Sequence, residues 1–121
     1  MNKKYYINNL AKMYSISEHT LRYYDKKNIL TCFKRDTNGY RYIEENDLRF
    51  IELVICLKKT NLSLKNIQRY LQLIEQGETT MKERFQIIDK QLKIAIKMRK
   101  DIDEQINFLK NKIEIFKKLL I

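Results

Sequence analysis

The stretch that decides the fold is SISEHTLRYYDKKNIL, residues Ser15 to Leu30. Ser17 is a preferred N-cap residue, and it predicts a helix that runs from Glu18 to about Lys27. Leu21 and Tyr24 are three residues apart, so they share one face of this helix, which we expect to point inward. The opposite face carries polar and aromatic side chains, namely His19, Arg22, Tyr23 and Lys26. This outer face is suited to meet phosphates and base edges.

The segment before this helix is also helical in pattern. Ile7, Leu10 and Ala11 lie on one side of a predicted helix from Ile7 to Tyr14, and SIS then forms a short turn. The arrangement is helix, short turn, helix.

A hairpin is predicted after it. The Asn38–Gly39 pair lies between CFKR and YRYI, a strong short-range signal for a tight hairpin turn. We therefore expect a two-stranded wing at about Thr31 to Ile43. Alternation along the strand predicts two faces, one with Tyr40 and Tyr42 and the other with Arg41 and Ile43.

Three more helices are predicted beyond the wing. Acidic residues 44, 45 and 47 suit the start of a helix that continues to about Lys59, and Asn61 ends it. Ser63 caps a fourth helix, which is followed by Gly77 at the expected left-handed C-terminal cap. Thr80 and Glu83 form a capping box for a fifth helix.

The fifth helix has the seam of a coiled coil. Its apolar positions alternate steps of four and three, at Met81, Phe85, Ile88, Leu92, Ala95, Ile102, Ile106, Leu109, Ile113, Phe116 and Leu120. A helix of this length would extend roughly 58 Å at 1.5 Å per residue, so it needs a partner helix, most simply its own copy. Arg99 interrupts the seam and either fixes the alignment or extends to solvent.

Composition limits the classes of function. Lys plus Arg is 25 against 15 acidic residues, a net charge of +10, which favours a polyanionic partner, nucleic acid first. There is no spanning segment or signal sequence, so we expect a cytoplasmic protein without a membrane partner. Cys32 and Cys56 have no metal-ligand spacing, and no metal or other cofactor is expected. Neither paired catalytic carboxylates nor a Gly-rich phosphate loop is present, which argues against an enzyme.

Three motifs in order resemble the MerR-type transcription regulators: TLRYYD at Thr20–Asp25, NGYRY at Asn38–Tyr42 and LSLKNI at Leu62–Ile67. The resemblance implies a mainly α fold, with a winged helix-turn-helix DNA-binding domain at 1–76 and a long antiparallel coiled-coil dimerisation helix at 77–121, without a separate effector domain. It also implies a homodimer through residues 81–120 on double-stranded promoter DNA with an over-long spacer, which it distorts for RNA polymerase to activate or repress. Ser15 and Asn28 stand where the family usually has Gly.

The resemblance assigns DNA contacts position by position. Arg22 and Tyr23 would face DNA from the recognition helix, with Tyr40 and Arg41 on the backbone from the wing and Lys59 and Ser63 in a second wing. Glu18 and His19 begin the recognition helix and are the candidates for base reading. In the alternative reading, Tyr23 and Tyr24 are both core aromatics and the lysines form a solvated face.

The stretch from Ile55 to Gln91 is similar to the AdhR- and NmlR-related branch of the family, in which one Cys after the wing responds to aldehydes or other electrophiles. Cys56 occupies that place. Lys59 on the same helix face would favour the thiolate and Glu52 would oppose it. Two alternatives stay open: a regulator of this type without cysteine sensing, and a basic coiled-coil adaptor that binds a different partner.

Overall fold

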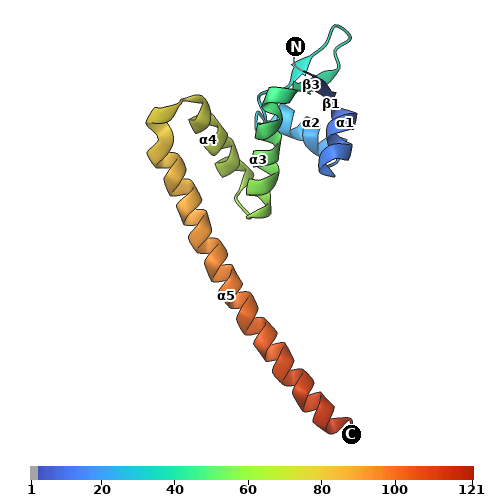
Figure 1. Cartoon of the computed structure of the whole chain (residues 1–121), viewed down its shortest axis with the longest axis vertical. Coiled ribbons are helices and arrows are strands. Elements are labelled where there is room, and N and C mark those ends of the chain that lie inside the picture. The colour runs from blue at the N-terminus through green and yellow to red at the C-terminus, as the bar shows by residue number, and fades with distance from the viewer. Residues whose placement is uncertain (1–2) are drawn as a thin grey trace. The chain divides into compact units, whose positions relative to one another are not determined.

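The computed structural model describes residues 3–121 (Figure 1). The elements in chain order are β1 (Lys4–Tyr6), α1 (Ile7–Tyr14), α2 (Glu18–Lys26), β2 (Lys34–Arg35), β3 (Arg41–Glu44), the 3-10 turn η1 (Glu45–Asp47), α3 (Leu48–Lys59), α4 (Leu64–Glu75), the 3-10 turn η2 (Glu78–Thr80) and α5 (Met81–Leu119). The chain divides into two units, the first ending at Arg84 and the second running from Phe85 to Ile121. The mainly α prediction is confirmed.

The helix-turn-helix of α1 and α2 forms as predicted. The hydroxyl of Ser17 accepts the N–H of Thr20 at 3.0 Å, which caps α2, and Leu21 and Tyr24 are buried. Ser15 and Asn28 take φ values of 52° and 56°, in the left-handed region that favours glycine. Asn populates this region more readily than most residues, and Ser15 adopts it at some cost to allow the turn between the helices.

The two-stranded hairpin predicted at about Thr31 to Ile43 forms from β2 and β3. A third strand, β1, was not predicted, and it completes an antiparallel sheet in the order β1-β3-β2. β1 comes from the segment before α1, and it pairs Tyr5 with Ile43. The hairpin between β2 and β3 has a three-residue loop, because the N–H of Asp36 donates to the carbonyl of Tyr40 at 3.0 Å. Gly39 has φ +84°, which suits this loop.

The assignment of Tyr40 and Tyr42 to one face and of Arg41 and Ile43 to the other stays a prediction. Tyr42 and Ile43 are both buried in β3, the central strand of the sheet. Tyr40 lies outside the strand and is 65% exposed. The wing thus contributes a buried strand to the core and exposes its polar tip.

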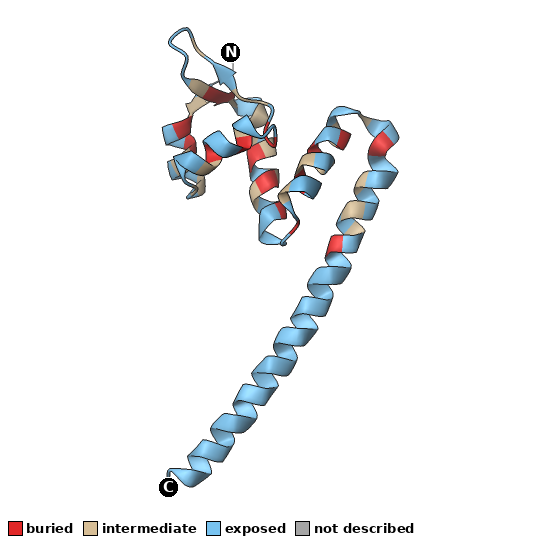
Figure 2. Cartoon of the chain, turned by 180° about the vertical axis from the view of Figure 1, so that it is seen from behind, coloured by how far each residue is buried: buried red, intermediate tan, exposed pale blue. Residues whose placement is uncertain are grey.

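Helices α3 and α4 form the rest of the first unit's core. Ile51, Val54 and Ile67 are fully buried, and Figure 2 shows buried positions along the inner sides of these helices. Asn61 ends the turn after α3 with φ 66°, and the hydroxyl of Ser63 caps α4 by accepting the N–H of Asn66 at 3.1 Å. Both predictions are confirmed.

The junction between α4 and α5 differs from its prediction. Gly77 has a positive φ of 91° but a ψ of −161°, so it is not a left-handed cap. Thr80 and Glu83 do not form a capping box. The hydroxyl of Thr80 lies 2.6 Å from the carbonyl of Leu73, while the carboxylate of Glu83 binds Arg69 at 3.0 Å. The hydroxyl of Thr80 therefore donates to a backbone carbonyl near the end of α4 instead of capping α5.

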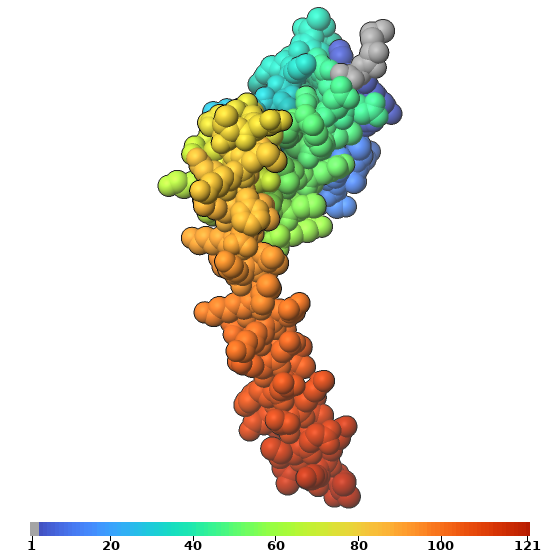
Figure 3. Space-filling model, turned by 60° about the vertical axis from the view of Figure 1, so that its left-hand side comes forward, coloured from blue at the N-terminus to red at the C-terminus, as the bar shows by residue number. Residues whose placement is uncertain are grey.

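The second unit is the remainder of α5, a helix of 39 residues in all. In the space-filling view of Figure 3 it is the orange-to-red column of atoms, with side chains projecting along its length. Its apolar seam is exposed, for example Leu92 and Leu109 at 57% and Phe116 at 59%. Over residues 3–121, no helix combines the length and the apolar character that crossing a bilayer would demand.

Candidate nucleic-acid interface

The beginning of α2 borders a hollow of about 420 Å³, here called the first hollow. The start of α1, the first turns of α2 and the tip of the wing line it, through Tyr6, Ile7, Asn8, Glu18, Arg22, Gly39, Tyr40 and Arg41. Four residues predicted to contact DNA are therefore brought together: Glu18, Arg22, Tyr40 and Arg41. Two of them are arginines, and the N-cap residue of α1, Tyr6, makes no side-chain cap bond. Arginine side chains and free N–H groups at a helix N-terminus both suit a phosphate.

Arg22 is available to a ligand in the first hollow. Its guanidinium lies 3.2 Å from the carboxylate of Glu18, and the two side chains are 53% and 47% exposed. Exposed pairs of this kind contribute little stability, about 0.3–0.5 kcal/mol for residues four apart on a helix. A phosphate can therefore replace Glu18 as the partner of Arg22 at small cost.

Arg41 is held more firmly than the sequence suggested. Its Nε lies 2.7 Å from Oδ2 of Asp25, and the side chains are only 26% and 27% exposed. The pair joins β3 to α2. It fixes the wing against the recognition helix, a role that the strand pattern alone did not indicate.

Tyr40 owes its position to Asp36. The carboxylate of Asp36 accepts the N–H groups of Asn38 and Tyr40, both at 2.9 Å, and the hydroxyl of Tyr6 at 3.1 Å. These hydrogen bonds, that of Tyr40 foremost, lower the pKa of Asp36. Arg35 adds a bond to the carbonyl of Gly39 at 3.0 Å. The sequence reading missed Asp36, although an Asp three residues before Gly39 is a turn signal.

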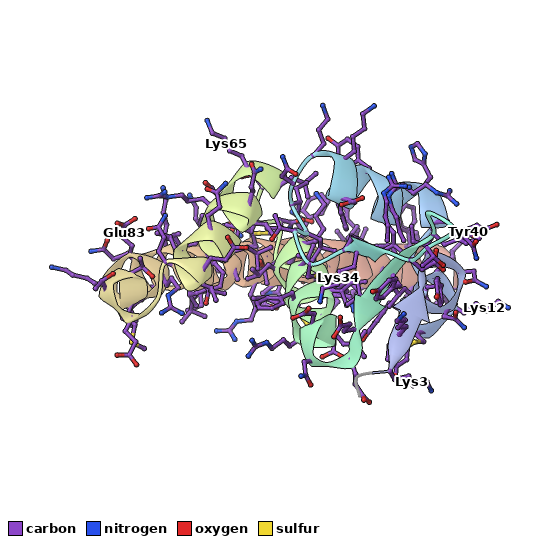
Figure 4. All side chains as sticks on the ribbon, turned by 90° about the horizontal axis from the view of Figure 1, so that it is seen from above. Lys3, Lys12, Lys34, Tyr40, Lys65 and Glu83 are labelled. Atoms are coloured by element: carbon purple, nitrogen blue, oxygen red, sulfur yellow. The ribbon has the colours of Figure 1, made fainter. Side chains whose placement is uncertain are left out.

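The other end of α2 borders a second hollow of about 290 Å³, lined by Tyr23, Lys27, Ile29, Leu64, Lys65 and Gln68. The side-chain amide of Gln68 donates to the carbonyls of Lys27 and Asn28 at 3.1 and 3.3 Å, which fastens α4 to the end of α2. Lys27 and Lys65 were not predicted as contacts. In Figure 4, α2 lies between the labelled Lys65 and Tyr40. Each end of the recognition helix thus has its own cationic hollow.

The remaining predicted contacts lie at the surface. Tyr23 is 41% exposed whereas Tyr24 is buried, so the reading of both tyrosines as core aromatics is wrong. His19 is exposed on the first turn of α2, outside both hollows. Lys59 is exposed at the end of α3, and the hydroxyl of Ser63 is already engaged as the cap of α4.

The two cysteines differ in environment. Cys56 is exposed on α3, and Cys32 is partly buried. Burial, followed by the negative charge of Asp47, raises the pKa of Cys32 to about 11. Near Cys56, Glu52 accepts the hydroxyl of Tyr14 at 2.9 Å. Among the residues that the structure describes, no group of three or more His, Cys, Asp or Glu side chains is arranged to hold a metal ion.

Relatives of known sequence share most of this chain. An uncharacterized HTH-type transcriptional regulator of Haemophilus influenzae is 32% identical over 108 residues, which cover 89% of this chain and 80% of the relative. The HTH-type transcriptional regulator AdhR of Bacillus subtilis is 32% identical over 79 residues, 65% of this chain and 56% of the relative.

A solved structure shares the fold over nearly the whole chain. HiNmlR, a MerR family regulator lacking the sensor domain and bound to promoter DNA, superposes with a TM-score of 0.84 and 31% identity, covering 96% of this chain and 92% of HiNmlR. The profile of the MerR HTH family regulatory proteins matches residues 5–74, which span α1, α2, the wing, α3 and nearly all of α4. The chain belongs to the MerR family and is a DNA-binding transcriptional regulator.

Proposed function

We propose that the chain binds promoter DNA as a homodimer, with α2 in the major groove and its two hollows on the flanking phosphates. The observation that carries this proposal is the pair of cationic hollows at opposite ends of α2. The first holds Arg22 and Arg41, and the second holds Lys27 and Lys65. A helix supported at both ends by phosphate contacts has its register on the duplex fixed.

Sequence would be read from the start of α2. Glu18 and His19 are the first two residues of this helix and both are exposed. N-terminal residues of recognition helices approach base edges, where carboxylates accept from cytosine. Tyr23 and Tyr40 would contact the backbone, and Lys59 and Ser63 would belong to the second wing near α4.

Dimerisation would use the seam of α5, as an antiparallel coiled coil over residues 81–120. Its support is the exposed 3.5-residue repeat of a helix too long for the first unit to cover. In this proposal residues 1–76 bind DNA and residues 77–121 pair the protomers in the cytoplasm. The dimer would distort a promoter with an over-long spacer and so change its use by RNA polymerase.

We further propose that Cys56 triggers the response. Its thiolate would attack an electrophilic carbon to form a C–S bond, and the carbonyl oxygen of an aldehyde would take up a proton. Exposure makes Cys56 accessible, and Lys59 follows one turn later on the same face. An adduct there would bias two DNA-bound states of the second wing.

The docking proposal is tested by salt titration of operator binding. Arg22→Ala should weaken binding to every DNA sequence and, because each dimer loses two phosphate contacts, reduce the slope of log K against log [salt] by about 2. Lys12→Ala is the matched control, because Lys12 is exposed on α1 and lines neither hollow. A change at His19 should instead alter preference among operators. Wild-type binding by Arg22→Ala at physiological salt would exclude this docking, and absence of binding to any DNA at low salt would favour the adaptor alternative.

The sensing proposal is tested by treating the DNA-bound protein with an aldehyde or a maleimide and following transcription in vitro. Cys56→Ser should bind the operator as the wild type does and lose the response, while Cys32→Ser keeps it. Mass spectrometry should find the adduct on Cys56. A full response from Cys56→Ser would eliminate this residue as the sensor and leave the DNA-binding proposal intact.

A further inference from the structure

A third cavity lies where the segment after α2 meets α3 and α4, and it shares one lining residue, Ile29, with the second hollow. This crease has a volume of about 250 Å³ and is lined by Ile29, Leu30, Thr31, Cys32, Asp47, Phe50, Leu71 and Glu75. Ile29, Leu30 and Leu71 are buried and give it an apolar wall. Its size falls just below the range of about 300–1,000 Å³ typical of ligand pockets, so it suits a small molecule.

The charge of the crease is opposite to that of the chain. Asp47 and Glu75 line it, and no Lys or Arg does, although the chain carries 25 Lys plus Arg against 15 acidic residues. Within residues 3–121, the carboxylate of Asp47 takes part in no hydrogen bond or ion pair. Among the described residues, Glu75 accepts only the neutral hydroxyl of Thr31, at 2.8 Å. Neither carboxylate thus forms a hydrogen bond or an ion pair with a cation among the described residues.

The neighbouring cations are engaged elsewhere. Lys34, which senses the charge of Asp47, is bound to Glu44 at 2.6 Å. Arg49 lies over the ring of Phe50, 4.7 Å from its centroid, and is not part of the lining. The pKa of the Cys32 thiol is consistent with a negative electrostatic potential inside the crease. Burial raises this pKa most, and the charges of Asp47, Asp25 and Glu75 raise it further. This thiol is therefore neutral and does not compete for a cation.

We propose that the crease binds a small organic cation with an apolar body, such as a protonated arylalkylamine. The hydrocarbon part packs against Ile29, Leu30 and Leu71, and the ammonium lies with the carboxylates of Asp47 and Glu75. Apolar burial alone would accept any small hydrophobe, whereas the two carboxylates select the charged one. The site lies wholly within the first unit.

Occupancy of the crease would reach the DNA-binding surface through α4. Leu71 and Glu75 belong to the same helix whose Gln68 fastens the end of α2. A ligand that joins α4 to residues 29–32 would favour one position of α4 over others, and with it the geometry of the second hollow. This regulatory step rests on the proposed function, whereas cation binding does not.

Binding is measured on the full chain without DNA, by amide NMR titration with benzylamine as the cation and benzyl alcohol as its neutral analogue. We expect benzylamine to bind with a Kd on the order of 1 mM, given its few heavy atoms. The shifts should centre on the amides of residues 29–32, 47, 50, 71 and 75. Benzyl alcohol should bind at least about fivefold more weakly, because it lacks the charge.

Variants locate the charge. Asp47→Asn and Glu75→Gln should each weaken benzylamine binding about five- to tenfold. Glu78→Gln removes the same charge from an exposed position outside the crease and should leave the affinity unchanged. The proposal is overturned if benzyl alcohol binds with equal affinity or if the shifts map to other residues. It is also overturned if binding does not saturate at tens of millimolar benzylamine, which is the result expected when a second copy of the chain fills the crease. The comparison of benzylamine with benzyl alcohol uses only the wild-type protein, so it tests the proposal even if a variant fails to fold.

Discussion

The ion pair between Asp25 and Arg41 should contribute more to stability than any exposed pair on the same surface. The partners are 26% and 27% exposed and lie 2.7 Å apart, so water screens them poorly. Their energetic coupling is isolated by a double-mutant cycle with Asp25→Asn, Arg41→Gln and the double variant. We expect a coupling free energy of about 1.5–2 kcal/mol, at the lower end of the range for hydrogen bonds to charged groups.

The Glu18–Arg22 pair is the internal control for this experiment. Its side chains are 53% and 47% exposed, and we expect a coupling of about 0.3–0.5 kcal/mol that fades above about 0.5 M salt. Free energies of unfolding come from urea titrations at one fixed protein concentration, because association of the chains would shift apparent stability. The coupling of Asp25 with Arg41 should persist in salt. If it is no larger than that of Glu18 with Arg22, exposure does not govern these pairs and Arg41 is not a structural anchor of the wing.

Three further outcomes are expected. The hydrogen bonds to Asp36 favour its ionised form and lower its pKa in the folded protein, so the stability that they add above the unfolded pKa is lost as the pH falls through the lowered pKa. In an NMR pH titration, the chemical shift of the Tyr40 amide should change with a midpoint below the ordinary aspartate pKa. A midpoint at the ordinary aspartate value would contradict this expectation. Thr80→Val should cost about 1–2 kcal/mol of unfolding free energy in urea, because the buried hydroxyl serves the end of α4, and an unchanged stability would remove that role. Ile106→Glu should weaken self-association by about 2–4 kcal/mol in sedimentation equilibrium, because it places a charge in the seam. Asn111→Glu, on the opposite face of α5, should leave self-association unchanged. Equal effects of the two substitutions would refute the assignment of the seam as the dimer contact.

Features set by local sequence were predictable. Ser17 and Ser63 cap their helices as expected, and Leu21 and Tyr24 are buried together, because capping and helical spacing depend on residues within one or two turns. The outward position of Arg22 follows from the same spacing. These signals were enough to recognise the recognition helix.

Features created by distant pairing were not predictable in this way. β1 is only three residues long and exists because β3 offers it an edge, which in turn buries Tyr42. The ion pair of Arg41 joins residues 16 apart in sequence. Thr80 and Glu83 matched a local motif, but better partners from α4 took both side chains.

The second hollow was missed for a similar reason. Lys27 and Lys65 lie far apart in sequence and come together only because Gln68 fastens α4 to the end of α2. A lysine count gives net charge but not this convergence. Only the packing of α4 distinguishes these two lysines from the other exposed ones.

In the proposed antiparallel dimer, Arg99 would make sliding of the long helices costly. In an antiparallel pair whose seams overlap from Ile88 to Leu120, Arg99 of each helix lies opposite Leu109 of the other. The two arginines are then ten residues apart, about 15 Å along the axis. A slip of one heptad in one direction brings them to three residues, about 4.5 Å, while the apolar steps still match. Two cations meeting in an apolar seam would repel, so a single residue separates two alignments that the hydrophobic repeat alone would treat as nearly equivalent.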